Sequence, residues 1–440
     1  MYPECRDPVR ISELANEEFH ALANRDQFAF WGAGRDRRAR RSAIAILVWH
    51  RRNPTISVMR EGYRVMDSDL HVIEGAAVFE DYLDERWRSV GPTYRGWGPT
   101  GFPWWTVACA EGDRSIPPWA GSSQVASAQA ALHGRNDDIY AEAKAHGYDP
   151  ASTLAAMDIE GIDVAVMFRT FASMVLSLDD LDAQHADAIA RAFNDWLHDY
   201  CAADPARLKS SAIVSLHDPE LAAAEARRAV QRGALAVVLL PIPVAGRNLH
   251  SSECDVLWAE IERLGVPLCL HGTSGAAAKD YVSNRFTGLA NERTLNHASA
   301  FGVELMLAFG ALSVGGVMMR FPRMKVALLE GNLGWLPWWL DRLDDQWKKY
   351  GKGESVALDA LPSEYFRRQC WIGADIDESF VPLVAERVGE DRIVISTDYP
   401  HQDGPFPHAI EELLERKDLS PTLLRKLLWD NCAELYGLAG

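Results

Sequence analysis

The chain has 440 residues, of which 48% are hydrophobic and 24% are charged, a composition typical of a globular protein with a large core. Its 45 basic and 62 acidic side chains leave a formal net charge of −17, and so acidic a protein repels the phosphate backbone of nucleic acids. No apolar run approaches the roughly 18 to 20 residues of a membrane-spanning helix. We therefore expect neither nucleic acid nor a membrane as a partner.

The 7 cysteines show no CxxC spacing and no paired framework, which argues against a structural zinc site and against a disulfide scaffold. A reducing, cytoplasmic location is the expectation. Residues 1–62 differ from the rest because they are basic, with an arginine cluster from Arg35 to Arg41. A targeting signal is one interpretation, but no small-residue cleavage site follows the short apolar run from Ala43 to Trp49. We expect a loosely ordered N-terminal extension.

From residue 63 to residue 440, short apolar runs alternate with helical patterns, which is typical of repeated βα units and a parallel sheet. Asp218 and Ser420, each followed by a proline, predict helix N-caps. Eight strand–helix units favour a closed (β/α)8 barrel over an open sheet, and no glycine-rich phosphate-binding motif follows the first strand. The predicted strands cover residues 63–66, 163–168, 208–214, 236–240, 267–270, 325–329, 370–372 and 392–396.

A long insertion, residues 72–149, separates the first predicted strand from its helix. It is rich in glycine, proline, tryptophan and tyrosine, especially from Tyr94 to Trp105, and is too aromatic for a disordered linker. The composition predicts a folded cap over one mouth of the barrel.

Polar side chains follow three of the predicted strands. Asp69 and His71 come after the first strand and point to the same side of an extended chain. His271 follows the fifth strand and Asp398 the eighth. Each alone has an ordinary structural interpretation, such as a turn-capping aspartate or a hydrogen-bonded core histidine. The carboxyl ends of barrel strands meet at one mouth, so the set predicts a site for one divalent ion, Zn²⁺ first, with Mn²⁺ or Fe²⁺ as alternatives.

Glu330 ends the sixth predicted strand, where it would transfer a proton at a metal-bearing mouth or form a salt bridge with a distant arginine. Arg342 lies in a predicted helix over 335–350, where an ion pair with a neighbouring aspartate is the plain alternative to a functional role. Structural roles are favoured for Arg169, His217 and His297. An anionic substrate would nevertheless need Arg342 or Arg169 to offset the negative charge of the protein.

Four segments, 67–74, 155–166, 329–335 and 396–401, resemble the amidohydrolase-related branch of the amidohydrolase superfamily, which includes aminocarboxymuconate-semialdehyde decarboxylase and the hydroxybenzoate decarboxylases. The resemblance implies a metal-dependent TIM barrel, with a homodimer or higher oligomer as the expected assembly. It implies that one divalent ion is held by Asp69, His71, His271 and Asp398. It implies that Asp398 also handles protons and that Arg342 binds a substrate carboxylate. From their positions we further expect catalytic roles for Glu330 and His401, and substrate binding by Arg169 and Asn332.

The chain departs from this family pattern at two positions. It has Asp69-x-His71 where many members have HxH or ExH, and Glu330 where the named decarboxylases have a histidine. The second difference replaces the acid/base group, so the reaction does not transfer directly. No lysine stands at the end of the fourth strand, at Leu239 to Pro241, which favours one metal ion over two.

The sequence thus predicts a metal-dependent enzyme acting on a small organic substrate, aromatic or cyclic and carboxylated. Hydrolysis and non-oxidative decarboxylation use the same residues, and both remain open at this point. A barrel that binds metal without catalysis is the alternative from another class of protein.

Overall fold

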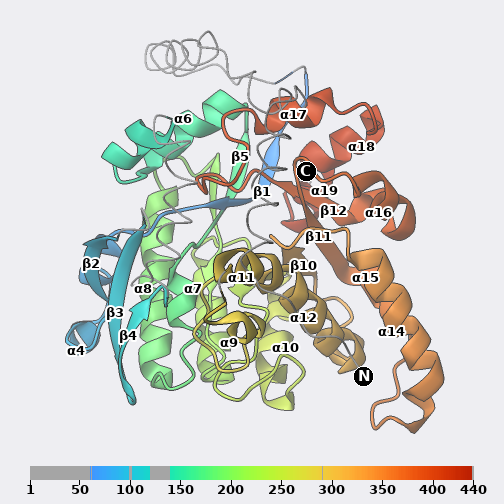
Figure 1. Ribbon diagram of the computed structural model, residues 1–440, viewed down its shortest axis with the longest axis horizontal. Helices are drawn as coiled ribbons and strands as arrows, with labels where there is room; N and C mark the ends of the chain where they lie inside the picture. Colours follow the sequence, from blue (N-terminus) through green and yellow to red (C-terminus); the bar gives the residue numbers. More distant parts are fainter. Residues whose placement is uncertain (1–59, 61, 99–101, 119–138, 290, 439–440) are drawn as a thin grey trace, which may run out of the picture. The chain divides into compact units, whose positions relative to one another are not determined.

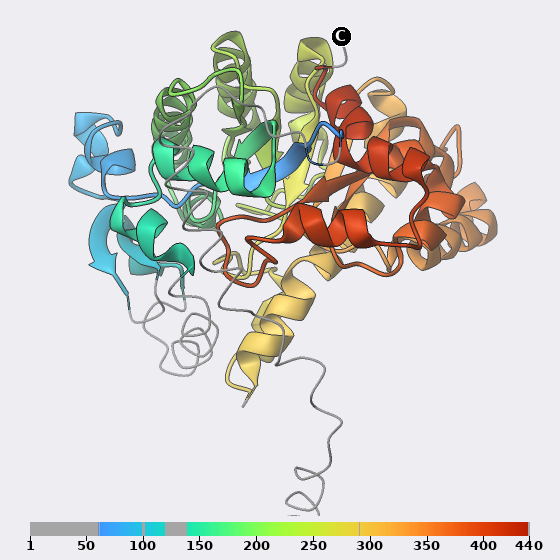
Figure 2. The same ribbon diagram turned by 90° about the horizontal axis from the view of Figure 1, so that it is seen from above.

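The computed structural model describes residues 60–438 except 61, 99–101, 119–138 and 290 (Figure 1). The predicted extension, residues 1–62, lies outside the described residues apart from 60 and 62. Within the described part, parallel strands are surrounded by helices (Figures 1 and 2).

Parallel strands form two sheets, in the orders β1-β5-β6 and β12-β11-β10-β9-β8-β7. Their residues are almost entirely buried, as expected where helices cover a parallel sheet. The strands are β1 (Met66–His71), β5 (Val164–Phe168), β6 (Leu208–Ser210), β7 (Ala212–Ile213), β8 (Val237–Leu239), β9 (Leu268–His271), β10 (Val326–Leu329), β11 (Cys370–Asp375) and β12 (Ile393–Ser396).

The two sheets close into a single barrel. β6 and β7 are separated by Ser211 alone, so one stretch of chain belongs to both sheets. At the other junction, the Ser68 hydroxyl donates to the Ile395 carbonyl at 2.6 Å, and the His71 N–H donates to the Tyr399 carbonyl at 2.8 Å. These contacts join β1 to β12 and confirm the predicted (β/α)8 barrel.

The bounds predicted for the first strand, residues 63–66, were wrong, because β1 runs from Met66 to His71. The apolar run in the sequence stops before the strand ends, because most of the strand carries polar side chains that are nevertheless buried. Asp67, for example, is 1% exposed and accepts hydrogen bonds from the hydroxyl and the N–H of Thr397. The metal-ligand candidates of this segment therefore belong to the strand itself, which fixes their direction.

Helices follow the strands as predicted, and two predicted caps are confirmed. The Asp218 carboxylate accepts the N–H of Glu220, and the Ser420 hydroxyl accepts the N–H of Leu423. The main helices are α6 (Pro150–Glu160), α8 (Ala183–Cys201), α9 (Pro219–Gln231), α10 (Asp255–Leu264), α12 (Gly302–Val314), α14 (Leu336–Tyr350), α15 (Pro362–Gln369), α16 (Val381–Val388), α17 (Ala409–Glu415), α18 (Pro421–Arg425) and α19 (Asn431–Leu435).

The aromatic insertion folds as a three-stranded antiparallel sheet of β2 (Thr93–Trp97), β3 (Pro103–Cys109) and β4 (Gly112–Ile116). Trp105 anchors it, since this side chain is 1% exposed and its ring lies 5.6 Å from that of Phe171 in the loop after β5. The described part of the insertion is therefore a folded cap attached to the barrel by aromatic packing, as predicted.

Two consecutive helices, α11 (Glu292–Ala300) and α12, form one run from Glu292 to Val314 that is long and apolar enough to cross a membrane by length and composition alone. The expectation that no apolar stretch of such length occurs was therefore wrong for this segment. In the fold it packs partly into the core, and Glu304 within it is 1% exposed and accepts the N–H of Val282 at 2.6 Å. Core helices pass the same test, so the run is weak support for a membrane span.

Candidate metal centre

Four strand ends of the barrel deliver polar side chains to one place. Asp69 and His71 come from β1, His271 is the last residue of β9, and Glu330 directly follows β10. Asp398 lies two residues beyond the end of β12. Glu330 and Asp398 have φ angles of 51° and 57°, in the left-handed region that costs free energy for any residue with a side chain. Such strained residues cluster at functional sites.

The imidazole of His271 lies at the centre of the group. Its Nε2 is 2.9 Å from Asp69 Oδ2, 2.9 Å from Glu330 Oε2 and 3.2 Å from His71 Nε2. Asp398 is next to this cluster, with its Oδ1 3.4 Å from His71 Nε2. The structure thus brings three of the predicted ligands, Asp69, His71 and His271, together with Glu330 in one group that could hold a metal ion. Asp398, the fourth predicted ligand, lies in a second group with His71, Glu330 and His401.

The outer nitrogens of both histidines fix the tautomer. His71 Nδ1 lies 2.8 Å from the Arg169 carbonyl, and His271 Nδ1 lies 2.9 Å from the Gly272 carbonyl. A carbonyl oxygen only accepts, so each Nδ1 carries hydrogen and each Nε2 of a neutral ring directs its lone pair inward. Backbone carbonyls orient metal-ligating histidines in the same way.

The buried carboxylate of Asp69 also fits a cation. Within the described residues, neither of its oxygens has a hydrogen-bond partner while His271 is neutral, although the side chain is fully buried. Only a protonated His271, 2.9 Å from Oδ2, would donate to it. A buried acceptor without a partner is costly, and a metal ion at the inward-facing nitrogens would satisfy both oxygens. Carboxylate and imidazole donors suit Zn²⁺, Mn²⁺ and Fe²⁺. The side chains therefore fit a divalent ion.

Electrostatics favour positive charge at the same point. Burial opposes protonation of His271, but the carboxylates of Asp69 and Glu330 outweigh it and raise the pKa of His271 to about 9. Burial, together with the neighbouring His401, lowers the pKa of His71 to about 4. His271 can therefore carry a positive charge beside the carboxylates of Asp69 and Glu330. These carboxylates would attract a divalent cation at the same point more strongly, because it carries two charges.

A second pair, Asp398 and His401, lies beside the ligand cluster. His401 Nδ1 is 2.6 Å from Asp398 Oδ1, and His401 Nε2 is 3.1 Å from the Thr170 hydroxyl oxygen. Thr170 donates its only hydroxyl hydrogen to the Val72 carbonyl, 2.7 Å away, so it accepts from His401 Nε2–H. The proton between His401 Nδ1 and Asp398 is therefore the one free to move.

This pair holds its proton at neutral pH. Burial opposes charge on His401, but the Asp398 carboxylate outweighs it and raises the pKa of His401 to about 10. Burial also raises the pKa of Asp398 well above its usual range. Whichever partner carries the proton, the pair can donate it to a group bound in front of it.

Glu74 is a site residue that the sequence reasoning left without a role. Its fully buried carboxylate accepts the N–H groups of Thr170, Phe171 and Ala172 at 2.9 to 3.1 Å. It thereby fixes the loop that carries Thr170 against His401. Its place three residues after His71, in the first family motif, was the available signal.

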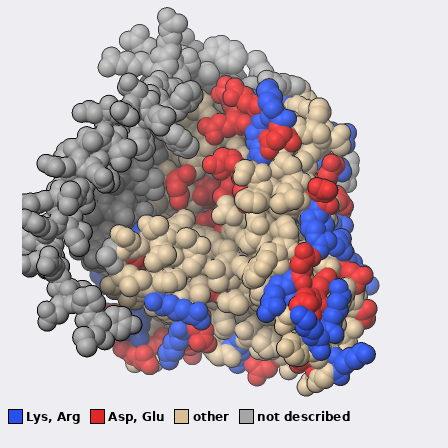
Figure 3. Space-filling model, turned by 45° about the vertical axis from the view of Figure 1, so that its right-hand side comes forward, with Lys and Arg blue, Asp and Glu red and all other residues tan. Residues whose placement is uncertain are grey.

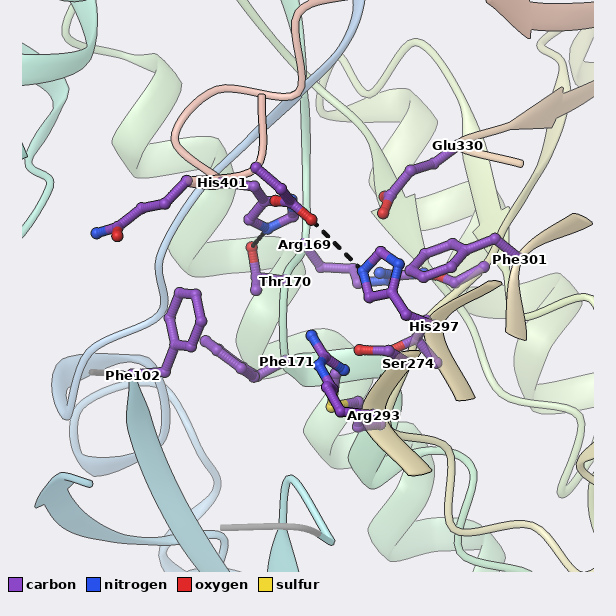
Figure 4. Close-up of a pocket in the computed structure, with 15 residues that line it drawn as sticks. Phe102, Arg169, Thr170, Phe171, Ser274, Arg293, His297, Phe301, Glu330 and His401 are labelled. Carbon is purple, nitrogen blue, oxygen red and sulfur yellow. Dashed lines mark hydrogen bonds and ion pairs between the residues drawn. The ribbon is translucent and has the colours of Figure 1, made fainter. Parts of the chain in front are cut away.

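A cavity of about 560 Å³, which includes space open to solvent at its mouth, adjoins the metal-ligand cluster (Figure 4). Phe102 from the cap, Phe171 and Phe301 supply aromatic walls, and the rings of Phe102 and Phe171 lie 5.5 Å apart. Polar groups reach the cavity from Arg169, Thr170, Thr273, Ser274, Arg293, His297, Glu330, His401, Gln402 and Asp403.

Of the three predicted substrate-binding residues, one lines the cavity and the other two do not. Arg169 lines the cavity and is buried, and its Nη2 donates to the His271 and Gly272 carbonyls at 2.8 Å. Arg342 is half-exposed on α14 and lies 3.8 Å from Asp345. Asn332 is exposed and donates to Asp375 at 2.7 Å. Among the described residues that line the cavity, neither Arg342 nor Asn332 occurs.

Two further histidines mentioned in the sequence analysis have different surroundings. His217 is buried between the Ser215 hydroxyl and the Leu178 carbonyl, as a structural histidine would be. His297 instead lines the cavity, with its Nε2 3.5 Å from Asp403 Oδ2.

Comparison with known proteins supports this fold. The amidohydrolase family model matches residues 96–438. The gamma-resorcylate decarboxylase of Polaromonas sp. strain JS666 is 26% identical over 284 residues, covering 60% of this chain and 83% of the relative. The 2-amino-3-carboxymuconate-6-semialdehyde decarboxylase of Dictyostelium discoideum is 23% identical over 304 residues, covering 68% of this chain and 80% of the relative.

Solved structures show the same fold. An amidohydrolase from Mycobacterium avium subsp. paratuberculosis K-10 superposes with a TM-score of 0.67 at 23% identity, covering 86% of this chain and 100% of the other. A 5-carboxyvanillate decarboxylase from Novosphingobium aromaticivorans, complexed with manganese and 4-hydroxy-3-methoxy-5-nitrobenzoic acid, superposes with a TM-score of 0.61 at 20% identity, covering 86% and 97%.

These findings confirm the resemblance seen in the sequence motifs. The clustered carboxylates and imidazoles provide the divalent-metal site that such an enzyme requires. Because the family model spans most of the barrel, the chain belongs to the amidohydrolase family and is a metal-dependent hydrolase or carboxy-lyase.

Proposed function

We propose that this protein is a metal-dependent decarboxylase of a small carboxylated aromatic substrate. The observation that carries the proposal is the Asp398–His401 pair, which holds a movable proton beside the metal-ligand cluster and next to a cavity with phenylalanine walls. The decarboxylase names of the curated relatives support the same reaction.

The proposed ligands of one divalent ion are Asp69, His71 and His271, with Glu330 in the same group. Asp398 lies beside this group, 3.4 Å from His71 Nε2. When bound, the ion supplies Lewis-acid charge that attracts a substrate carboxylate and an adjacent oxygen. Zn²⁺ and Mn²⁺ both suit these donors, and the manganese bound in the Novosphingobium structure supports Mn²⁺.

The chain's own residues orient the substrate and supply the proton. Phe102, Phe171 and Phe301 hold a planar ring by apolar contact and exclude water from it. As the bond to the carboxylate carbon breaks, its electron pair stays on the ring carbon and CO₂ departs. The Asp398–His401 pair then gives its proton to that carbon, while Glu74 and Thr170 keep His401 in place.

A screen of substrates tests the reaction class. We expect CO₂ release from hydroxylated aromatic carboxylates by the metal-loaded protein, and no turnover of esters, lactones or amides of similar size. Hydrolysis without CO₂ release would assign the same residues to a hydrolase. If the fully metal-loaded protein converted neither the aromatic carboxylates nor the esters, lactones and amides, it would be a barrel that binds metal without catalysis.

We also propose a homodimer in the cytoplasm. Trp338 on α14, Phe380 and Leu383 are each more than half exposed. On the face that Figure 3 shows, residues without charge lie between separate groups of acidic and basic side chains. Exposed large apolar side chains suit a subunit interface. The described cysteines are all free thiols, which supports a reducing compartment.

A further inference from the structure

The buried carboxylate of Glu74 holds a loop that the metal ligands and the proton donor share. Its Oε1 accepts the N–H groups of Thr170, Phe171 and Ala172 at 2.9 to 3.1 Å, and its Oε2 lies 3.1 Å from the N–H of Phe171. Hydrogen bonds to a charged acceptor are stronger than those between neutral groups. The conformation of residues 169–172 therefore depends on this one side chain.

The first of these amides shares a peptide group with the carbonyl that orients a proposed metal ligand. The Thr170 N–H lies 3.1 Å from Glu74 Oε1, and the Arg169 carbonyl lies 2.8 Å from His71 Nδ1. The N–H and the C=O of a planar trans peptide group point in opposite directions. Because Glu74 holds the N–H, it aims the carbonyl at His71 and so keeps Nε2 of that ring directed toward the other ligands.

The side chain of Arg169 extends this arrangement to the second imidazole of the metal-ligand group. Arg169 is 2% exposed, and its Nη2 donates to the Gly272 carbonyl at 2.8 Å. The same carbonyl lies 2.9 Å from His271 Nδ1. Arg169 therefore orients both histidines of the group, His71 with its own carbonyl and His271 through Gly272.

The next residue, Thr170, orients the proton donor. Its hydroxyl oxygen lies 3.1 Å from His401 Nε2, and the hydroxyl donates to the Val72 carbonyl at 2.7 Å. The rings of His71 and His401 lie 4.2 Å apart, so the two imidazoles that depend on this loop are neighbours. A shift of residues 169 and 170 would change the hydrogen bonds of both rings at once.

We infer that Glu74 is a positioning residue for both the metal ligands and the proton donor, acting through the backbone of residues 169–171. It does not occur among the described residues that line the cavity, so it acts through other residues and not on the substrate. The effect on proton donation by His401 rests on the proposed function. The effect on His71 and His271 is measured by metal binding and requires no turnover.

Chelator competition for Mn²⁺ with the full chain tests the effect on the metal ligands. E74Q keeps the shape of the side chain but replaces one acceptor oxygen with a donor, among N–H groups that need acceptors. We expect its Mn²⁺ affinity to fall by about 10- to 100-fold, the usual effect of losing a residue that orients a metal ligand. The matched control is E304Q, because Glu304 is also a buried carboxylate that accepts a backbone N–H, from Val282, and this variant should bind Mn²⁺ as the wild type does.

A second pair of variants tests the effect on the proton donor. T170V removes the hydroxyl beside His401 Nε2 but keeps the Thr170 N–H and the Arg169 carbonyl. We expect kcat for CO₂ release to fall by about 10- to 100-fold, with KM and Mn²⁺ affinity changed less than about threefold. T170S retains the hydroxyl and should restore most of the turnover.

Each outcome decides the inference. Weaker Mn²⁺ binding in E74Q but not in E304Q supports it, and loss of kcat in T170V with rescue in T170S supports it for His401. Wild-type Mn²⁺ affinity in E74Q, an equal loss in E304Q, or a rise in KM without a fall in kcat in T170V would each overturn it. Thermal melting of the metal-free proteins shows whether they are folded, and E74D, which keeps the charge on a shorter side chain, replaces E74Q if that variant does not fold.

Failure of the proposed function can be told apart from failure of this inference. If the wild type released CO₂ from no aromatic carboxylate, the proposed function would be refuted, and the Mn²⁺ affinity of E74Q relative to E304Q would decide the inference by itself.

Discussion

His401 Nδ1 lies 2.6 Å from Asp398 Oδ1, and the far nitrogen of the same ring meets the hydroxyl of Thr170, 231 positions away in the sequence. Nε2 donates its hydrogen to Thr170, whereas Nδ1 shares a proton with the Asp398 carboxylate. This partly buried pair can hold one proton beside the cavity in which we propose that the substrate ring binds.

The H401Q variant should therefore lose turnover, by about 10²- to 10⁴-fold, the usual contribution of general acid catalysis. Metal content should stay at the wild-type level, because His401 lies beside the ligand cluster of Asp69, His71 and His271. Steady-state CO₂ release and metal analysis of the same preparation check both statements. Wild-type turnover in H401Q would remove the pair from the mechanism.

The E330Q variant distinguishes proton transfer by Glu330 from its contribution to metal binding. The sequence predicts loss of turnover with metal retained. The structure adds that Glu330 Oε2 lies 2.9 Å from His271 Nε2, so we expect metal affinity to fall as well, by about 10- to 100-fold. Competition with a chelator measures the affinity, and D69N, which changes an orphaned buried ligand, provides the comparison. An unchanged affinity would restrict Glu330 to proton transfer.

Glu160 should make stability depend on pH. It is 1% exposed and accepts the N–H groups of Ala409 and Ile410, and burial raises its pKa to about 7 from the ordinary glutamate value of 4.5. The folded protein therefore binds more protons than the unfolded chain between these values, and the free energy of unfolding falls as pH rises through them.

Relative to E160Q, which cannot ionise, the wild type should lose up to about 3 kcal/mol of stability between pH 4.5 and pH 7.5. Urea unfolding of both proteins at several pH values measures the difference. A gap that stays constant over this range would contradict the raised pKa.

Oligomeric state can be tested at the exposed apolar area on α14 and α16. L383D places a charge where a 53% exposed leucine now stands, so it should shift a dimer toward the monomer without lowering the melting temperature by more than a few degrees. Sedimentation velocity checks the mass. K352D, at an exposed lysine beyond the end of α14, changes charge elsewhere and serves as the control. A monomeric wild type would refute the proposed dimer.

The sequence by itself determined the barrel and the core of its metal site. Alternating apolar runs and helix caps are local patterns, and the carboxyl ends of barrel strands meet at one mouth, so Asp69, His71, His271 and Asp398 could be grouped without coordinates. The error in β1 arose because its residues are polar yet buried, which periodicity does not reveal.

Tertiary structure alone decided which residues line the cavity. Arg293, Thr170 and Phe102 come from a helix, a loop and a cap that have no fixed place in a strand–helix repeat, and their meeting depends on how long connections fold over the barrel mouth. The same packing left Arg342 on an outer helix face. Periodic elements are specified by nearby residues, whereas the walls of the cavity are specified by contacts between distant ones.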